Sequence, residues 1–288
     1  MAEAWSEWPA PAKLNLFLHI VGRRADGYHL LQTVFQLLDW GDRLRLRPRG
    51  DGVVERVEGP AAIPPEVDLC VRAACALRER LGTTRGVDIA LDKRIPTGGG
   101  LGGGSSDAAT VLVALNRLWN GGLDVDDLAE IGLGLGADVP VFVRGRSAWA
   151  EGVGERLTPL ELSPKHYVIL DPREHVPTAE LFRAPELTRN TPQSTILDFV
   201  SGAETANAFE PVVRERYPRV ARALDWLGRH GAARLSGSGG CVFVAVDSAA
   251  AAAAIARECP PEFGAYTARG VNRSPLLDAL AAPEVCVK

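Results

Sequence analysis

One glycine-rich segment constrains this chain more than any other feature. Six of the eleven residues from 96 to 106 are glycine, and the segment separates a predicted strand at 87–91 from a helical pattern predicted to begin at Ser105 or Ser106. Glycine allows positive φ and close backbone approach, and the first turn of a helix offers unpaired N–H groups. The pattern therefore predicts a phosphate-binding loop, with a nucleoside triphosphate as the expected ligand. The loop residues are Pro96, Thr97, Gly98, Gly99, Gly100, Leu101, Gly102, Gly103, Gly104, Ser105 and Ser106.

Two common glycine motifs do not fit this loop. A Walker A loop requires a lysine before its final Ser or Thr, whereas this chain has Gly104 followed by Ser105. The dinucleotide fingerprint usually occupies the first βαβ unit of a parallel sheet, and this loop instead follows a β-rich stretch. Taken alone, the segment could also be a flexible connector.

A second glycine cluster lies at residues 235–241, between a predicted helix and a predicted strand. Two glycine loops from the two halves of the chain could close on one triphosphate and its acceptor. The alternative is a tight turn that needs positive φ at Gly237 and Gly239. The sequence leaves both interpretations open.

Composition excludes several classes of protein. Of the 288 residues, 46% are hydrophobic, and the formal net charge is -4 with both signs interspersed, so a globular chain without a nucleic-acid surface is expected. The five cysteines form no C-x-x-C pair, which argues against a disulfide framework and a zinc site. Neither a secretory signal nor a bilayer-length apolar run is recognisable. We therefore expect a reduced, cytoplasmic location and no membrane partner.

The pattern of apolar residues predicts an α+β protein. The first half has a β-rich beginning, and a turn-like stretch at 158–164 suggests an N-terminal domain at 1–157 and a C-terminal domain at 158–288. The predicted strands are 13–21, 33–40, 43–47 (after a turn at Gly41-Asp42), 53–57, 87–91, an extended segment within 136–143, 167–170, 241–246 and 264–269. The predicted helices are 66–81, 105–119, one from Asp124, 203–214, 218–230 and 248–258.

Two charged residues could carry chemistry if the fold brings them together. Phosphoryl transfer to an alcohol needs a carboxylate that orients or deprotonates the hydroxyl and cations that neutralise developing charge. Lys13 at the start of the first strand and Asp138 before Pro140 would supply both. Each residue alone is more simply interpreted as a surface charge. Ser105 or Ser106 could offer a hydroxyl to Mg²⁺ while capping the helix.

An aromatic residue and a histidine stand side by side in the turn that follows the first strand. Tyr28 and His29 could stack on a heterocycle and hydrogen-bond to it. The alternative is that Tyr28 packs over the sheet. The histidines lack the spacing of a metal-binding motif, so no metal-ligating protein residues are expected.

Five segments taken together resemble the GHMP kinase superfamily. They occur in the order typical of that superfamily, and the resemblance extends over nearly the whole chain. The segments are 11–16, 24–29, 96–106, 136–142 and 236–241. The resemblance is most specific to members that act on a cytidyl-linked alcohol. It implies ATP-dependent transfer of the γ-phosphoryl group to the 2-hydroxyl of 4-diphosphocytidyl-2-C-methyl-D-erythritol, in the non-mevalonate (methylerythritol phosphate) route to isoprenoid precursors.

The resemblance also implies residue roles. Lys13 and Asp138 match the two catalytic positions, and the loop at 96–106 would bind ATP. Asp68 stands where the family commonly has an amide on the adenine side, so that contact is left open. The residues matching the acceptor site are Asn15, Tyr28, His29, Thr178 and Phe182.

The implied fold pairs an N-terminal domain like ribosomal protein S5 domain 2 with a ferredoxin-like C-terminal domain. Mg²⁺ is expected to be held mainly by the ATP phosphates, and the chain is expected to be a monomer or weak homodimer. Two alternatives remain: a related kinase for another small alcohol such as mevalonate or homoserine, and a catalytically silent nucleotide sensor. Retention of both Lys13 and Asp138 disfavours the sensor.

Overall fold

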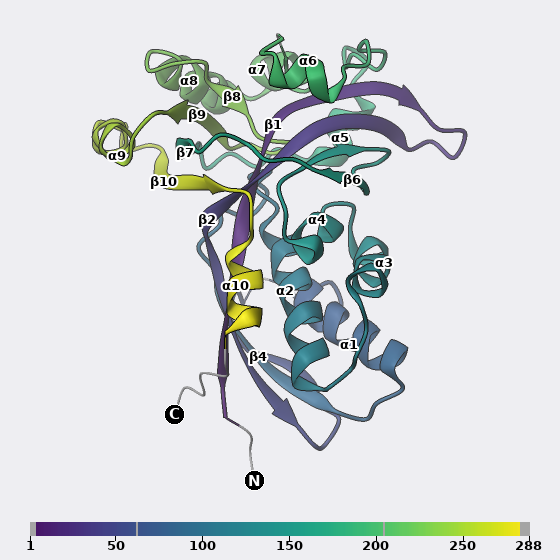
Figure 1. The fold of residues 1–288 in the computed structure, drawn as a ribbon. Helices are drawn as coiled ribbons and strands as arrows, with labels where there is room; N and C mark the ends of the chain where they lie inside the picture. The colour runs from purple at the N-terminus through teal and green to yellow at the C-terminus, as the bar shows by residue number, and fades with distance from the viewer. Residues whose placement is uncertain (1–3, 62, 204, 283–288) are drawn as a thin grey trace.

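A computed structural model describes residues 4–61, 63–203 and 205–282 (Figure 1). Helices and strands are mixed along the chain, which confirms the α+β class. The strands are β1 (Ser6–Arg23), β2 (His29–Arg49), β3 (Val54–Glu58), β4 (Gly86–Asp92), β5 (Ala148–Glu151), β6 (Arg156–Pro159), β7 (His166–Asp171), β8 (Arg234–Leu235), β9 (Val242–Val246) and β10 (Gly264–Val271). The helices are α1 (Leu69–Leu81), α2 (Gly103–Leu118), α3 (Val125–Leu135), α4 (Val139–Arg144), α5 (Thr178–Arg183), α6 (Ile196–Val200), α7 (Glu210–Arg216), α8 (Pro218–Leu227), α9 (Ala249–Arg257) and α10 (Pro275–Ala281). None of the described helices is long and apolar enough to cross a membrane.

The strands form one connected sheet whose hub is β2. The main path runs β3-β4-β2-β10-β7-β9-β8, and both β1 and β5 also pair with β2. The β3–β4 pair is parallel, and the other described pairs are antiparallel. The long β1–β2 pair extends through both halves of the molecule (Figure 1).

The predicted turn at Gly41-Asp42 is wrong, because β2 continues through these residues. Gly41 pairs with Pro11 across the β1–β2 ladder, and a Cβ at Gly41 would lie 2.1 Å from the carbonyl oxygen of Ala10. Glycine is needed there for close approach of two strands, not for a change of direction.

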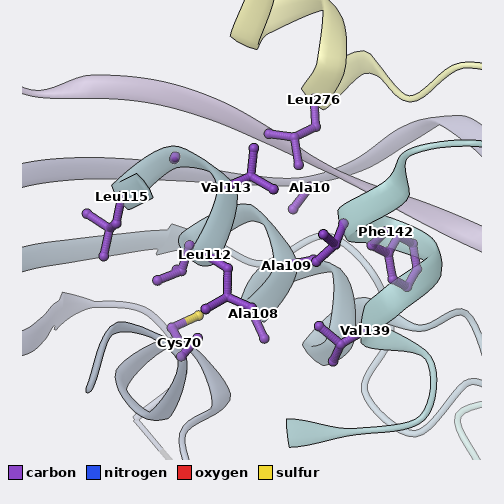
Figure 2. Close-up of a cluster of buried hydrophobic side chains, with 14 of the residues drawn as sticks. Ala10, Cys70, Ala108, Ala109, Leu112, Val113, Leu115, Val139, Phe142 and Leu276 are labelled. Carbon is purple, nitrogen blue, oxygen red and sulfur yellow. The ribbon is translucent and has the colours of Figure 1, made fainter. Parts of the chain in front are cut away.

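Helices α1 to α4 cover one face of the β1, β2 and β4 region and enclose the first hydrophobic core (Figure 1). Figure 2 shows the middle of this core, where Leu112 and Ala108 of α2 lie near Cys70 of α1, and Val139 and Phe142 of α4 approach from the other side. Each of these side chains is at most 2% exposed. Helix α2 is therefore buried along most of its length, which holds its N-terminus in a fixed position.

A second core lies in the other half of the molecule, yet the two halves share elements. Leu18 and Ile20 of β1 pack into the second core with Val168 and Phe209. In the opposite direction, Leu276 of α10 packs into the first core. The domain division at 157/158 stays a prediction.

Two local predictions near the site are wrong. Helix α2 begins at Gly103 with Gly102 as its N-cap, three residues before Ser105 and four before Ser106, the two predicted caps. Gly102 has φ +74°, a left-handed conformation that glycine adopts readily, and no side chain caps this helix.

The predicted extended segment at 136–143 is largely helix α4. Its valines suggested a strand, but a proline at the first helical turn is compatible with a helix, and Val139, Val141 and Val143 are all buried. Burial has outweighed the β-propensity of valine. The helix predicted from Asp124 is confirmed as α3, and the Asp124 side chain caps it by accepting hydrogen bonds from Asp126 N and Asp127 N.

Candidate active site

The glycine loop connects β4 to α2 in a strongly curved path. Gly98, Gly100 and Gly102 have φ of +75°, +77° and +74°, respectively, values that other residues rarely adopt. Ser105 lies in the first turn of α2, and Ser106 is completely buried there with no hydrogen-bond partner for its Oγ. Of the two predicted hydroxyl ligands, only Ser105 lines a cavity.

The second glycine cluster, at 235–241, forms hydrogen bonds directly with the glycine loop at 96–106. Cys241 N donates to Gly99 O at 3.1 Å, and Ser236 Oγ donates to Gly100 O at 3.1 Å. A Cβ at Gly239 would lie 2.0 Å from Gly100 N. Positive φ occurs at Gly237 (+58°), as the tight-turn interpretation requires, whereas Gly239 is needed for close approach. The two loops thus form one backbone assembly.

A cavity of about 320 Å³ lies against the first of these two loops, at residues 96–105. It is lined by the loop, by residues at the start of α1 and by Lys93 and Asp107. Asp68 is among the lining residues, but its carboxylate caps α1 through Cys70 N at 2.8 Å and also accepts from Arg56 Nε. Both oxygens of Asp68 are therefore engaged within the protein.

A half-buried lysine connects the two ends of the glycine loop. Lys93 Nζ lies 2.6 Å from Asp42 Oδ2 on β2 and 2.7 Å from Asp107 Oδ2 on α2. The other oxygen of Asp42 accepts from the backbone N–H groups of Arg94 and Ile95 at the entry to the loop. Burial raises the pKa of Asp107 to about 8, although the nearby Lys93 opposes this effect. Asp107 Oδ1 is buried without a partner.

The predicted catalytic pair is close together. Lys13 Nζ lies 3.1 Å from Asp138 Oδ2, and it donates to Gly100 O at 3.0 Å. Lys13 is almost fully buried on β1, whereas one third of the Asp138 side chain is exposed at the start of α4. The side chain of Asp138 makes no capping hydrogen bond to that helix. Its carboxylate can thus face both the lysine and the adjacent cavity.

Hydrogen bonds hold both the oxygen and the nitrogen of the Asn15 side-chain amide. Its Oδ1 accepts from Lys13 Nζ at 2.5 Å, and its Nδ2 donates to Thr33 Oγ1 at 2.9 Å. Its backbone N–H donates to Ser236 Oγ at 3.3 Å. The same serine therefore connects the Lys13–Asn15 strand to the glycine loop.

A second cavity of about 280 Å³ opens beside Lys13 and Asp138. Asn15, Thr178 and Phe182 also line it, and Thr178 Oγ1 lies 2.9 Å from Ser238 Oγ. Gly100 and Ser105 line both this cavity and the first one. The two cavities thus share two lining residues of the glycine loop, and Lys13 and Asp138 line the second cavity beside them.

Of the three ring-bearing residues predicted for the acceptor site, the structure brings two into contact with each other. The rings of His29 and Phe182 are stacked with centroids 4.8 Å apart, and Phe182 extends this contact to the cavity. Tyr28 is 64% exposed on the preceding turn, away from the lining of either cavity. Burial lowers the pKa of His29, and Arg189 and Arg23 lower it further.

Comparisons with known proteins match this architecture. Two family models, GHMP kinases N terminal domain and GHMP kinases C terminal, match residues 68–146 and 196–265. A 4-diphosphocytidyl-2-C-methyl-D-erythritol kinase from Halorhodospira halophila is 59% identical, with 96% of this chain and 97% of that protein covered. The chain belongs to this family of GHMP kinases. Its relatives are named kinases, so it is a phosphotransferase with an alcohol acceptor.

Solved structures support membership in the GHMP kinase family. A crystal structure of 4-(cytidine 5'-diphospho)-2C-methyl-D-erythritol kinase matches with a TM-score of 0.80 and 37% identity, covering 92% of this chain and 98% of that one. Homoserine kinase from Cytophaga hutchinsonii matches with a TM-score of 0.68 at 19% identity, covering 94% and 96%, which shows the shared fold alone. The predicted two-domain GHMP kinase fold is confirmed.

Sequence reasoning missed two groups of residues in this GHMP kinase. The Asp42–Lys93–Asp107 cluster had a detectable signal, since Lys93 and Asp107 lie on opposite sides of the glycine loop. Asp42 had none, because it appeared to belong to a turn. Arg189, which contacts His29, also lacked any motif.

The contact between the two glycine loops predicts that one methyl group added at Gly239 will lower activity. Gly239→Ala would place a Cβ against the backbone of Gly100, so the glycine loop at 96–106 must move. We expect kcat/KM for ATP to fall about a hundredfold, the usual consequence of roughly 1 Å of misplacement. Gly134→Ala is the matched control, because a Cβ at this α3 position has no neighbour within 4 Å. Unchanged kcat/KM in Gly239→Ala would contradict the loop contact.

The buried Asp107 predicts a pH effect on stability. With its pKa raised to about 8, the folded state holds a proton that the unfolded state loses near pH 4, so stability falls as pH rises between these values. Asp107→Asn removes this proton uptake. We expect its free energy of unfolding, measured by urea denaturation from pH 5 to 8, to fall less steeply than that of the wild type, by at most about 1.4 kcal/mol per pH unit. Identical slopes would show that Asp107 is ionised throughout.

Proposed function

We propose that the two cavities are the nucleotide and acceptor halves of one active site. The reaction is ATP-dependent phosphorylation of the 2-hydroxyl of 4-diphosphocytidyl-2-C-methyl-D-erythritol, a step of the non-mevalonate route to isoprenoid precursors. The observation that carries this proposal is that Gly100 and Ser105 line both cavities beside the Lys13–Asp138 pair. A phosphoryl group held by the loop would lie between donor and acceptor.

The loop at 96–106 binds the ATP phosphates in this proposal. Its positive-φ glycines expose backbone N–H groups, and the N-terminus of α2 adds the positive end of its dipole. No cluster of three or more His, Cys, Asp or Glu residues suited to a metal occurs in the described segments. Bound Mg²⁺ would neutralise phosphate charge, with the phosphates as its main ligands and Ser105 as the nearest candidate hydroxyl.

Asp138 orients the acceptor hydroxyl and takes its proton. The hydroxyl oxygen then forms a bond to the γ-phosphorus while the bond between this phosphorus and the β,γ-bridging oxygen breaks, and ADP leaves. Lys13 lies within ion-pair distance of Asp138 and would stabilise charge that develops on the attacking oxygen. Asn15 holds Lys13 from the opposite side and is positioned to hydrogen-bond near the reacting alcohol.

The acceptor half extends from Asp138 toward the aromatic residues. Phe182 and Thr178 line it, and His29 stacks on Phe182. We assign the cytosine ring to this end, with Tyr28 closing over it from the exposed turn. A small aliphatic acceptor would need no such aromatic group, which favours the cytidyl substrate over mevalonate or homoserine.

Other parts of the proposal concern the whole molecule. The division into an N-terminal domain at 1–157 and a C-terminal domain at 158–288 stays a prediction. So do the cytoplasmic location and the state of monomer or weak homodimer. The described cysteines are free thiols, which is compatible with a reducing compartment.

The substrate assignment predicts a simple pattern of turnover. Purified protein with Mg²⁺ and ATP should release ADP with 4-diphosphocytidyl-2-C-methyl-D-erythritol, and not above background with mevalonate, homoserine or no acceptor. Turnover with another alcohol would keep the phosphoryl-transfer site and remove the cytosine assignment. ATP binding without turnover on any acceptor would favour the nucleotide sensor.

The carboxylate role predicts a selective loss in one variant. Asp138→Asn should lower kcat by about 10²–10⁴, the usual contribution of a general base. Its dissociation constant for ATP, measured by calorimetry, should change little because the carboxylate acts on the acceptor. Asp126→Asn is the control, since this exposed carboxylate pairs with Arg144 at the other end of α4. A fully active Asp138→Asn enzyme would overturn the mechanism.

A further inference from the structure

Arg189 has an unusual set of hydrogen bonds beside the acceptor cavity. It lies between α5 and α6 and is half-buried. Its Nη2 donates to Phe182 O at 2.9 Å and to Ala184 O at 2.7 Å, and its Nη1 donates to Leu187 O at 3.0 Å. Its Nε donates to His29 Nε2 at 3.3 Å. One guanidinium thus connects carbonyl groups at the end of α5 and in the segment after it to the imidazole at the start of β2.

This contact determines which nitrogen of His29 can donate. Guanidinium has only N–H donors, so His29 Nε2 must act as the acceptor. A neutral imidazole then carries its single proton on Nδ1. The charge of Arg189 favours the neutral ring, and so does the charge of Arg23 at the end of β1. His29 therefore presents one N–H donor to its surroundings.

The same arginine fixes the aromatic group that lies against this imidazole. Phe182 stacks on His29 at an interplanar angle of 23°, and it also makes a T-shaped contact with Phe209, with ring centroids 4.9 Å apart. Because Arg189 holds the Phe182 carbonyl, it limits movement of the ring that lines the acceptor cavity. Nearby, Thr191 N donates to Ile20 O at 2.9 Å, which anchors the segment to β1.

We propose that Arg189 is a positioning residue that sets the base preference of the acceptor site by holding His29 as an Nδ1–H donor against the Phe182 ring. Cytosine offers an acceptor at N3, whereas uracil has an N–H donor at that position, so the fixed donor favours cytosine. This inference rests on the proposed cytidyl substrate. It assigns the selectivity to a residue outside the recognised motifs.

Inhibition by free nucleotides tests this role. Wild-type enzyme, Arg189→Met and Arg183→Met are compared for kcat, for KM of each substrate and for competitive inhibition by CDP and UDP. Arg183 is the control because it is an exposed arginine next to Phe182. In Arg189→Met we expect the acceptor KM to rise about tenfold, the cost of about 1.4 kcal/mol, while kcat and the KM for ATP change less than about threefold. Its preference for CDP over UDP should fall at least about fivefold. An unchanged preference would overturn the proposal.

A double-mutant cycle separates positioning from general support of the fold. If Arg189 acts through His29, adding Arg189→Met to His29→Phe should change the acceptor KM by less than about twofold. A full additional tenfold increase would show that Arg189 acts on the segment after α5 and would overturn the proposal. If Arg189→Met does not fold, Arg189→Lys replaces it, since it keeps the charge but lacks the planar set of donors. Its CDP preference should fall as well, and an unchanged preference would again overturn the proposal.

The outcomes distinguish this inference from the proposed function. A wild-type enzyme without turnover on the cytidyl acceptor would remove the substrate assignment before any variant is compared. A wild-type enzyme that turns it over, with equal inhibition by CDP and UDP, would leave the substrate in place and overturn only the role of Arg189.

Discussion

Contact between two glycine loops is the constraint on which the site depends. Gly100 and Gly239 approach so closely that neither position has room for a side chain. Because these loops come from distant parts of the sequence, the contact can form only when both hydrophobic cores are assembled. The glycine loop at 96–106 is therefore shaped by tertiary structure as much as by its own glycines.

Two lysine side chains then connect the glycine loop to the elements around it. On one side, Lys93 bridges Asp42 and Asp107 and so fixes the strand entering the loop to the helix leaving it. On the other side, Lys13 connects the loop carbonyl of Gly100 to Asp138. Lys93 pairs with two buried carboxylates and lines the first cavity, whereas Lys13 pairs with the partly exposed Asp138 and lines the second. The two lysines thus have different roles although both lie near the same glycines.

Much of this arrangement could be predicted from sequence because it depends on local patterns. The glycine loop, the α+β class and the Lys13–Asp138 pair all followed from motifs whose residue types limit their chemistry. The failures have a common cause. Gly41 resembled a turn residue, and the valines of α4 resembled a strand, because the decisive contacts come from segments distant in sequence. Arg189 was missed for the same reason, since its partner His29 is 160 positions away.

Packing of α10 against the first core has a consequence for how the molecule is made. Leu276 contributes to a core whose other fully buried side chains all come from residues before 151, and it lies near Ala10 and Val113 in that core (Figure 2). During synthesis, the N-terminal half emerges from the ribosome long before this leucine does. Its apolar surface stays incompletely covered until residue 276 has been translated and has left the exit tunnel. Chains interrupted before this residue would therefore leave that part of the first core open to solvent.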